Sequence, residues 1–198
     1  MIAFCRKLRQ DESGATIVEF AVVAPILFLV LFGGMELAHV AYVKTTLRNA
    51  LQEASRASGL EDGSTNAAAI DQKVEKSIKR VAPDADVKIK RTSYQDFSDV
   101  KTPEDFTDSN SNGRYDSTEC FVDINGNKKW DSDRGRKKSQ GGADDAVLYE
   151  VEVKYEKIFP LWALVGSSEK ITQLNAETTL RNQPYGTQVP NEGVNICP

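Results

Sequence analysis

The chain has 198 residues, with 25 Lys and Arg, 29 Asp and Glu, and a formal net charge of −4. This length suits one folded domain with an anchor and an embellishment. Basic residues are interleaved with acidic ones, so no basic stripe is available to attract a nucleic-acid backbone. The composition therefore argues against a nucleic-acid-binding role.

A long apolar segment, from Gly14 to Val43, follows a short basic leader. No charged residue occurs from Phe20 to Met35, and ten residues of this stretch are Leu, Ile, Val or Phe. At roughly −0.3 to −0.6 kcal/mol each, these ten favour insertion by about 3 to 6 kcal/mol, against roughly 3 kcal/mol for one central acid. Glu19 and Glu36 lie at the edges, where hydration lowers their cost. The sequence predicts one membrane span over about residues 15–43.

The flanking charges predict the orientation of this span. Arg6, Lys7 and Arg9 precede it, which keeps the leader cytoplasmic and places the remainder of the chain outside. A conventional secretory signal fits less well, because the apolar run is long and lacks a clean small-residue cleavage site. An uncleaved signal anchor remains an alternative.

The start of the apolar segment, "ESGATIVEFAVVAPILFLVLFGG", resembles TadE-like pseudopilins of the tight-adherence (Flp-type) pilus system. The resemblance implies that a prepilin peptidase cuts between Gly14 and Ala15, leaving Glu19 and Phe20 as mature residues five and six. It also implies other pseudopilins and the pilus assembly machinery as partners. The expected location is the bacterial inner membrane, with a single span and an extracytoplasmic C-terminal domain, or a pilus at the cell surface.

Glu19 has a physical reason to lie near the new N-terminus. After cleavage, its carboxylate lies one helical turn from the free amine of Ala15 and can pair with that amine or with a neighbouring subunit's. The carboxylate also complements the positive end of the helix. Alternatively, Glu19 is an acid that only reaches water from the edge of the span.

Helical spacing continues beyond the membrane. Leu37, Leu47 and Ala54 recur on one face, so we expect one long helix over residues 15–58, with Gly59 as its C-terminal stop. A second helix is expected within residues 64–84, capped by Asn66 or Ser64 and ended by Pro83, with its apolar face formed by Ile70, Val74, Ile78 and Val81.

Three segments alternate between apolar and polar residues as half-buried strands do: 86–94, 146–158 and 171–181. Together with the helices they predict an α+β domain over residues 59–181, whose small antiparallel sheet packs on the outer half of the first helix. Pilin-like proteins are generally built in this way. Residues 182–198 are expected to form a polar tail, although "LRNQPY", 180–185, resembles the end of TadE-like sequences except at Gln183.

Two consecutive loops within residues 108–134 carry the spacing of a calcium site. The first, "DSNSNGRYDSTE", matches D-x-[DN]-x-[DN]-G-x5-E, a pattern that supplies hard oxygen ligands to Ca²⁺. Its expected ligands are Asp108, Asn110, Asn112, the Arg114 carbonyl, Asp116 and Glu119.

The second loop matches the calcium pattern less completely. It keeps the early ligand spacing with Asp123, Asn125, Asn127 and Asp131. Lys128 replaces the glycine and Arg134 replaces the closing acid, so Asp133 would have to substitute or the two loops would have to share ligands. Alternatively, both loops are polar surface loops built from Asx-turns.

The cysteine count agrees with export. Cys5 would leave with the leader, so that Cys120 and Cys197 remain and could pair in an oxidising compartment. Such a cross-link could contribute up to about 4 kcal/mol in the chain-entropy model. Two free thiols are the alternative.

The sequence contains no recognisable catalytic motif, and His39, the single histidine, lies at the membrane. We therefore expect no enzymatic activity and no small-molecule substrate. The leading hypothesis is a TadE-like minor pseudopilin that assembles or primes an adhesive pilus. The alternatives are an uncleaved, membrane-anchored calcium-binding surface module for adhesion, and a pseudopilin of a secretion system. The apolar segment 159–166 is either core or a contact with the membrane or a partner.

Overall fold

The computed structural model describes residues 13–58, 66–164, 166–183, 187–188 and 190–198. These residues form an α+β structure with two compact units. The first unit contains the chain up to Tyr42 together with Glu156–Thr172, and the second contains Val43–Tyr155 with Gln173–Pro198. The expected α+β class is confirmed. The leader, residues 1–12, and the expected helix stop at Gly59 lie outside the described residues.

One helix, α2, runs from Ser13 to Ser58 and carries Pro25 in its interior. Its end coincides with the end expected from the apolar spacing. Proline cannot donate a backbone hydrogen bond within a helix. A membrane helix tolerates it where other groups bond to the backbone carbonyl that proline leaves without a donor. The helix contributes its first part to the first unit and its second part to the second unit.

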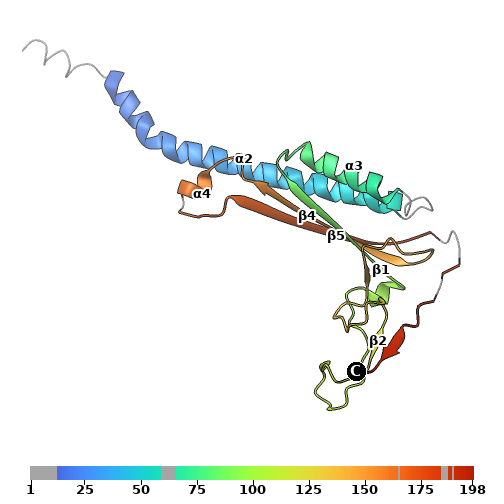
Figure 1. Cartoon of the computed structure of the whole chain (residues 1–198). Coiled ribbons are helices and arrows are strands. Elements are labelled where there is room, and N and C mark those ends of the chain that lie inside the picture. The colour runs from blue at the N-terminus through green and yellow to red at the C-terminus, as the bar shows by residue number, and fades with distance from the viewer. Residues whose placement is uncertain (1–12, 59–65, 165, 184–186, 189) are drawn as a thin grey trace, which may run out of the picture. The chain divides into compact units, whose positions relative to one another are not determined.

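The second unit is built on a four-stranded sheet with the order β3-β1-β4-β5. Its strands are β1 (Asp86–Tyr94), β3 (Arg136–Lys137), β4 (Ala146–Glu156) and β5 (Ile171–Arg181). β1 pairs antiparallel with β4, and Ile89 lies opposite Val151. Figure 1 shows α3 (Ala67–Lys79) running alongside the second part of α2. The three strands expected from alternation are all present.

The larger of two apolar clusters among the described residues of this unit joins its helices to its sheet. It joins the α2 stripe to one face of α3 and to the inward face of β4. Fully buried members are Val43, Leu47, Ile78, Tyr149 and Val153. The expected stripe was wrong at Leu37, which is 73% exposed, and the part of α2 that joins this core begins at Val43.

A polar clamp ties α3 to the sheet at the edge of this core. Asp71 Oδ1 accepts hydrogen bonds from Arg91 Nη2 and from the Tyr149 hydroxyl, both at 2.5 Å. Arg91 also donates to the carbonyl of Ala67 and lies over the Tyr149 ring, 5.0 Å from its centroid. A charge-assisted bond that is shielded from water in this way is stronger than an exposed ion pair.

A two-stranded sheet, β2 (Phe121–Asp123) with β6 (Val194–Ile196), lies in the segment that follows β1 and in the C-terminal tail. Phe121 lies opposite Ile196, and the adjacent residues Cys120 and Cys197 form a disulfide across 77 positions of sequence. The expected disulfide is confirmed. The polar tail contains a strand that the sequence did not predict, because three residues are too few to show alternation.

The position of the core predicts that shortening a side chain of α2 to alanine lowers the free energy of unfolding at buried positions but not at exposed ones. Leu47→Ala should lower the free energy of unfolding by about 2–5 kcal/mol, because it leaves a cavity in the buried cluster. Leu37→Ala, the matched control on the same helix, should change it by less than about 0.5 kcal/mol in detergent. Urea unfolding followed by near-UV circular dichroism measures both. Equal losses would contradict the assigned core.

Candidate functional site

The first calcium-like loop is closed by carboxylates that accept backbone hydrogen bonds. Asp108 accepts from the N–H groups of Asn112 and Gly113 at 3.1 and 2.8 Å. Glu119, which is 3% exposed, accepts from Ser109 at 2.8 Å and from the ninth loop residue, Asp116, at 3.0 Å. The seventh residue, Arg114, donates its N–H to Asn112 Oδ1 at 2.7 Å. The loop thus turns sharply at Gly113, and Glu119 bonds to its second and ninth residues.

The second loop repeats this backbone although its sequence departs from the pattern. In the first loop, the fourth and sixth residues, Ser111 and Gly113, have φ of 59° and 72°. In the second loop, the corresponding Gly126 and Lys128 have φ of 82° and 64°. Lys128 therefore adopts the left-handed conformation that glycine takes in the first loop, at a cost of roughly 1–2 kcal/mol.

Glu104 supplies the closing carboxylate that the second loop lacks. Its Oε1 accepts from Ile124 N at 2.8 Å and its Oε2 from Asp131 N at 3.0 Å, which are the second and ninth residues of that loop. Glu119 accepts from the second and ninth residues of the first loop. Glu104 is only 1% exposed. Glu104, which precedes both loops in the sequence, thus takes the place of the closing acid. The second loop has Arg134 at that position of its own sequence.

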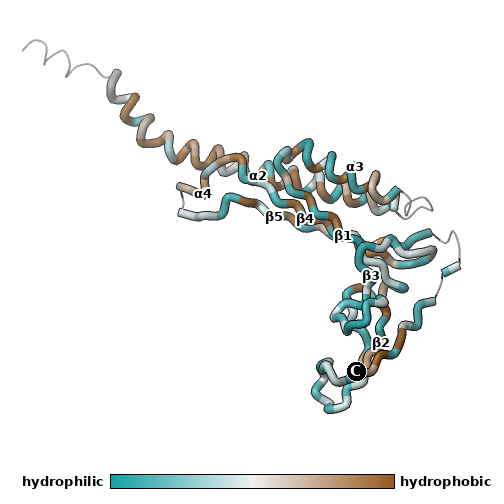
Figure 2. Tube along the Cα trace, viewed as in Figure 1, coloured by the Kyte–Doolittle hydropathy of each residue, from teal (hydrophilic) through white to brown (hydrophobic). Residues whose placement is uncertain are grey.

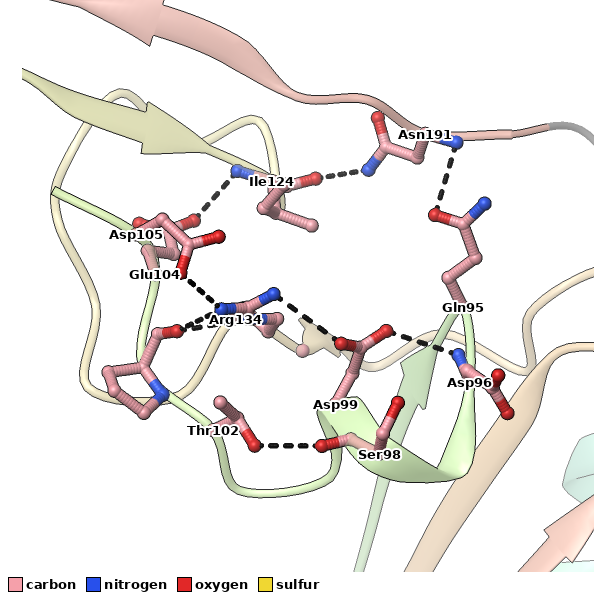
Figure 3. A network of polar contacts seen from close by, with 12 residues as sticks. Gln95, Asp96, Ser98, Asp99, Thr102, Glu104, Asp105, Ile124, Arg134 and Asn191 are labelled. Carbon is pink, nitrogen blue, oxygen red and sulfur yellow. Dashed lines mark hydrogen bonds and ion pairs between the residues drawn. The ribbon is translucent and has the colours of Figure 1, made fainter.

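The two residues considered for closing the second loop point elsewhere. Arg134 contacts Asp99 and Asp105 at 3.4 and 3.1 Å, as Figure 3 shows. Asp133 accepts a hydrogen bond from the Tyr94 hydroxyl at 3.0 Å. Sequence reasoning missed Glu104 because it examined acids only within the loop. The absence of a closing acid there was a signal to search the flanking segments.

In both loops, two asparagine amides converge on one aspartate. Nδ2 of Asn110 and of Asn112 each lie 2.7 Å from Asp116 Oδ2. In the second loop, Asn125 and Asn127 donate to Asp131 Oδ2 at 2.8 and 2.5 Å. Among the residues that the structure describes, no three His, Cys, Asp or Glu side chains are grouped as a metal site. The ten expected metal-binding residues stay a prediction.

Aromatic side chains from both loops form a small packing cluster between them. The rings of Tyr115 and Trp130 stack with centroids 4.8 Å apart, and Phe106 and Phe121 meet Tyr115 edge-on. Trp130 Nε1 donates to the carbonyl of Glu104 at 2.9 Å. Aromatic pairs contribute about 0.5–1.5 kcal/mol beyond their buried area. This cluster, together with β2–β6 and the disulfide, organises a segment that contains few regular elements.

At the other end of the chain, the first part of α2 exposes its apolar side chains. Gly14 and Ala15 lie in its first turns, and Glu19 and Phe20 are exposed. The exposed apolar residues include Ile17, Val22, Ile26, Leu29 and Leu31, and Figure 2 shows hydrophobic colour along this part of the helix. Within the described residues, α2 is the single helix long and apolar enough to cross a membrane.

Residues 14–56, about a fifth of the chain, match the family model for TadE-like protein. The N-terminal helix is a TadE-like segment. The expected resemblance is therefore confirmed, and the TadE-like match begins at the residue where cleavage is predicted. With the apolar helix, it indicates a membrane-anchored protein associated with a tight-adherence pilus. No curated protein and no solved structure matches the chain.

The loop carboxylates predict a response of the protein to acid. Burial alone would raise the pKa of Asp131, but hydrogen bonds from Asn125 and Asn127 and the charge of Lys137 hold that pKa below its ordinary value. A pKa that is lower in the folded state contributes stability above the unfolded value of 3.8, and this stability is lost as the pH falls through the folded pKa.

The stability difference between wild type and Asp131→Asn should therefore shrink on acidification from about pH 6 to about pH 3. Urea midpoints at each pH measure it. Asp84→Asn, at an exposed aspartate outside the loops, is the control and should follow wild type throughout. A difference for Asp131→Asn that is independent of pH would contradict the assignment.

Proposed function

We propose that the chain is a minor pseudopilin that assembles or primes a tight-adherence pilus after cleavage between Gly14 and Ala15. The observation that carries the proposal is the division of α2. The TadE-like match covers both parts, but the first part leaves a continuous apolar surface exposed, whereas the second part buries an apolar stripe in a folded unit. A helix of this kind can lie in lipid or pack among equivalent helices of a filament.

The proposed mechanism is packing, not catalysis. A prepilin peptidase removes the leader, and the apolar part of α2 then leaves the inner membrane for an array of other pseudopilins. Glu19 lies on the exposed surface and four residues from Ala15, so its carboxylate is accessible to an amine from the same or an adjacent chain. The folded unit is extracytoplasmic in this account, which agrees with the Cys120–Cys197 disulfide.

Glu19→Gln tests this mechanism. We expect loss of pili, counted by electron microscopy, while the amount of membrane-associated protein and the disulfide remain at wild-type level. Glu53→Gln, at an exposed glutamate farther along the same helix, is the matched control and should retain pili. Normal piliation by the Glu19→Gln variant would contradict the proposal. A pseudopilin of a secretion system would instead lose secretion.

We also propose that the two loops bind Ca²⁺, one ion each. The supporting observation is their shared backbone, with left-handed residues at the same two positions and a buried closing carboxylate in each. Calcium takes six to eight oxygen ligands, which carboxylates, amide oxygens and backbone carbonyls supply. The amide nitrogens of the four asparagines face Asp116 and Asp131. Binding would require these amides to turn so that their oxygens, together with these carboxylates, face the ion. If the leader is never cut, the same loops would make the chain an anchored calcium-binding surface module.

Isothermal titration calorimetry tests this second proposal. Wild type should bind two Ca²⁺ per chain, Glu104→Gln should retain only the first-loop site, and Glu119→Gln only the second. Asp105→Asn is the control, because this neighbour of Glu104 has a 73% exposed side chain and should keep both sites. Absence of Ca²⁺ binding by wild type would contradict calcium binding. Two intact sites in Glu104→Gln would contradict the role of Glu104.

A further inference from the structure

Residues 157–170, which we name the interface segment, follow β4 and pack against α2 within the first unit. The segment contains the short helix α4 (Leu161–Leu164) and is apolar at Ile158, Phe159, Leu161 and Trp162. Ile158 is 55% exposed. The family match, residues 14–56, does not include this segment, and the proposed function does not explain it.

An aromatic ladder joins the interface segment to the membrane span. The rings of Phe28 and Phe32 stack with centroids 5.8 Å apart, and Phe159 stacks on Phe32 at 5.1 Å. Glu36 Oε2 accepts a hydrogen bond from the Phe159 N–H at 3.2 Å. Leu161 lies beside Gly33, where its Cδ1 is 3.9 Å from an ideal Cβ position. The contacts of the segment therefore lie along the last turns of the span.

The position of Glu36 indicates how deep in the bilayer these contacts lie. No charged residue lies between Glu19 and Glu36 on α2, a distance of about 25 Å along the helix axis, which is close to the thickness of the hydrocarbon layer. Glu36 therefore marks the outer boundary, and Phe32 lies one turn, about 6 Å, below it. A side chain that stacks on Phe32 reaches the same depth.

We propose that the interface segment is a lipid-binding anchor at the outer headgroup–acyl boundary of the bilayer. This inference rests on the proposed function, in which the first part of α2 spans the membrane. Phe159 and Leu161 enter the hydrocarbon beside Phe32 and Gly33, and Trp162 lies at headgroup level, where indole rings are favoured. Lys170 lies over the Trp162 ring, 5.2 Å from its centroid. The Glu36 carboxylate satisfies the Phe159 N–H, which would otherwise be costly to bury in lipid.

The charges of the neighbourhood favour a zwitterionic surface. Lys157 and Lys170 are offset by Glu169 within the segment and by the adjacent Glu156 at the end of β4, so this neighbourhood carries no excess of positive charge for anionic lipids. Binding should depend on apolar depth and be insensitive to the fraction of anionic lipid. The anchor holds α2 at one depth, and the segment must leave the lipid when the helix is extracted into a filament.

Tryptophan quenching in nanodiscs that hold one full-length chain each tests the proposal. In a Trp130→Phe variant, Trp162 is the only tryptophan, because the chain has two. Phosphatidylcholine brominated near the headgroup should quench its emission more strongly than lipid brominated near the chain end. Adding Phe159→Asp should reduce this quenching. Adding Val194→Asp instead, at an exposed apolar residue of the second unit, should leave it unchanged.

A tryptophan at a second position distinguishes failure of this inference from failure of the membrane span. Phe28→Trp in a chain without Trp130 and Trp162 should be quenched by bromine deep in the bilayer. If this reporter is unquenched, the membrane span fails, and the interface segment fails with it. If it is quenched while Trp162 is not, only the interface segment is overturned. Trp162 quenching that is lost when a disc holds two chains would assign the surface to a second copy and overturn the lipid assignment.

Discussion

The apolar stripe of α2 from Val43 to Ala54 is the surface on which the second unit is built. α3 and the sheet bury their apolar faces against it, and the central members of this cluster are fully excluded from water. The same helix exposes nearly all its apolar side chains before that point. Because α2 is continuous, any process that moves its N-terminal part along the helix axis also moves the folded unit attached to it. The proposed extraction of the helix from the membrane would require such a coupling.

The segment that contains the two loops is held together without a large hydrophobic core. Two loops with the same backbone share one aromatic cluster, and a strand from the C-terminal tail pairs beside them. The disulfide at the end of this strand pair restrains the unfolded chain, and burial of Glu104 and Glu119 provides acceptors for backbone N–H groups. These links join the loop segment within itself and to the C-terminal tail, and none of them is part of the four-stranded sheet.

The regular elements were predictable because their apolar residues recur with a clear period. β1 and β5 have the expected bounds, and the disulfide followed from the even cysteine count of the expected mature chain. The family resemblance rested on Gly14, Glu19 and the apolar run, and the family match confirms it. The start of the buried stripe was misplaced at Leu37, because periodicity alone does not distinguish a face that meets protein from one that meets lipid.

The closing of the second loop was beyond sequence reasoning for a different reason. Glu104 reaches it across the whole first loop, and a motif that is read along the chain contains no information about such a contact. The positive φ of Lys128 was equally hidden, since lysine gives no sign of a left-handed turn. The strands β2 and β6 are three residues each and are stabilised by pairing and by the disulfide, not by their own pattern.

The intact mass of the membrane-extracted protein, expressed with and without a matching prepilin peptidase, tests the central claim most directly. The pseudopilin account predicts that the peptidase removes residues 1–14 and leaves Ala15 at the N-terminus, with the Cys120–Cys197 disulfide retained. An uncut chain, in cells where the same peptidase processes another prepilin, would contradict the account and leave a membrane-anchored surface module.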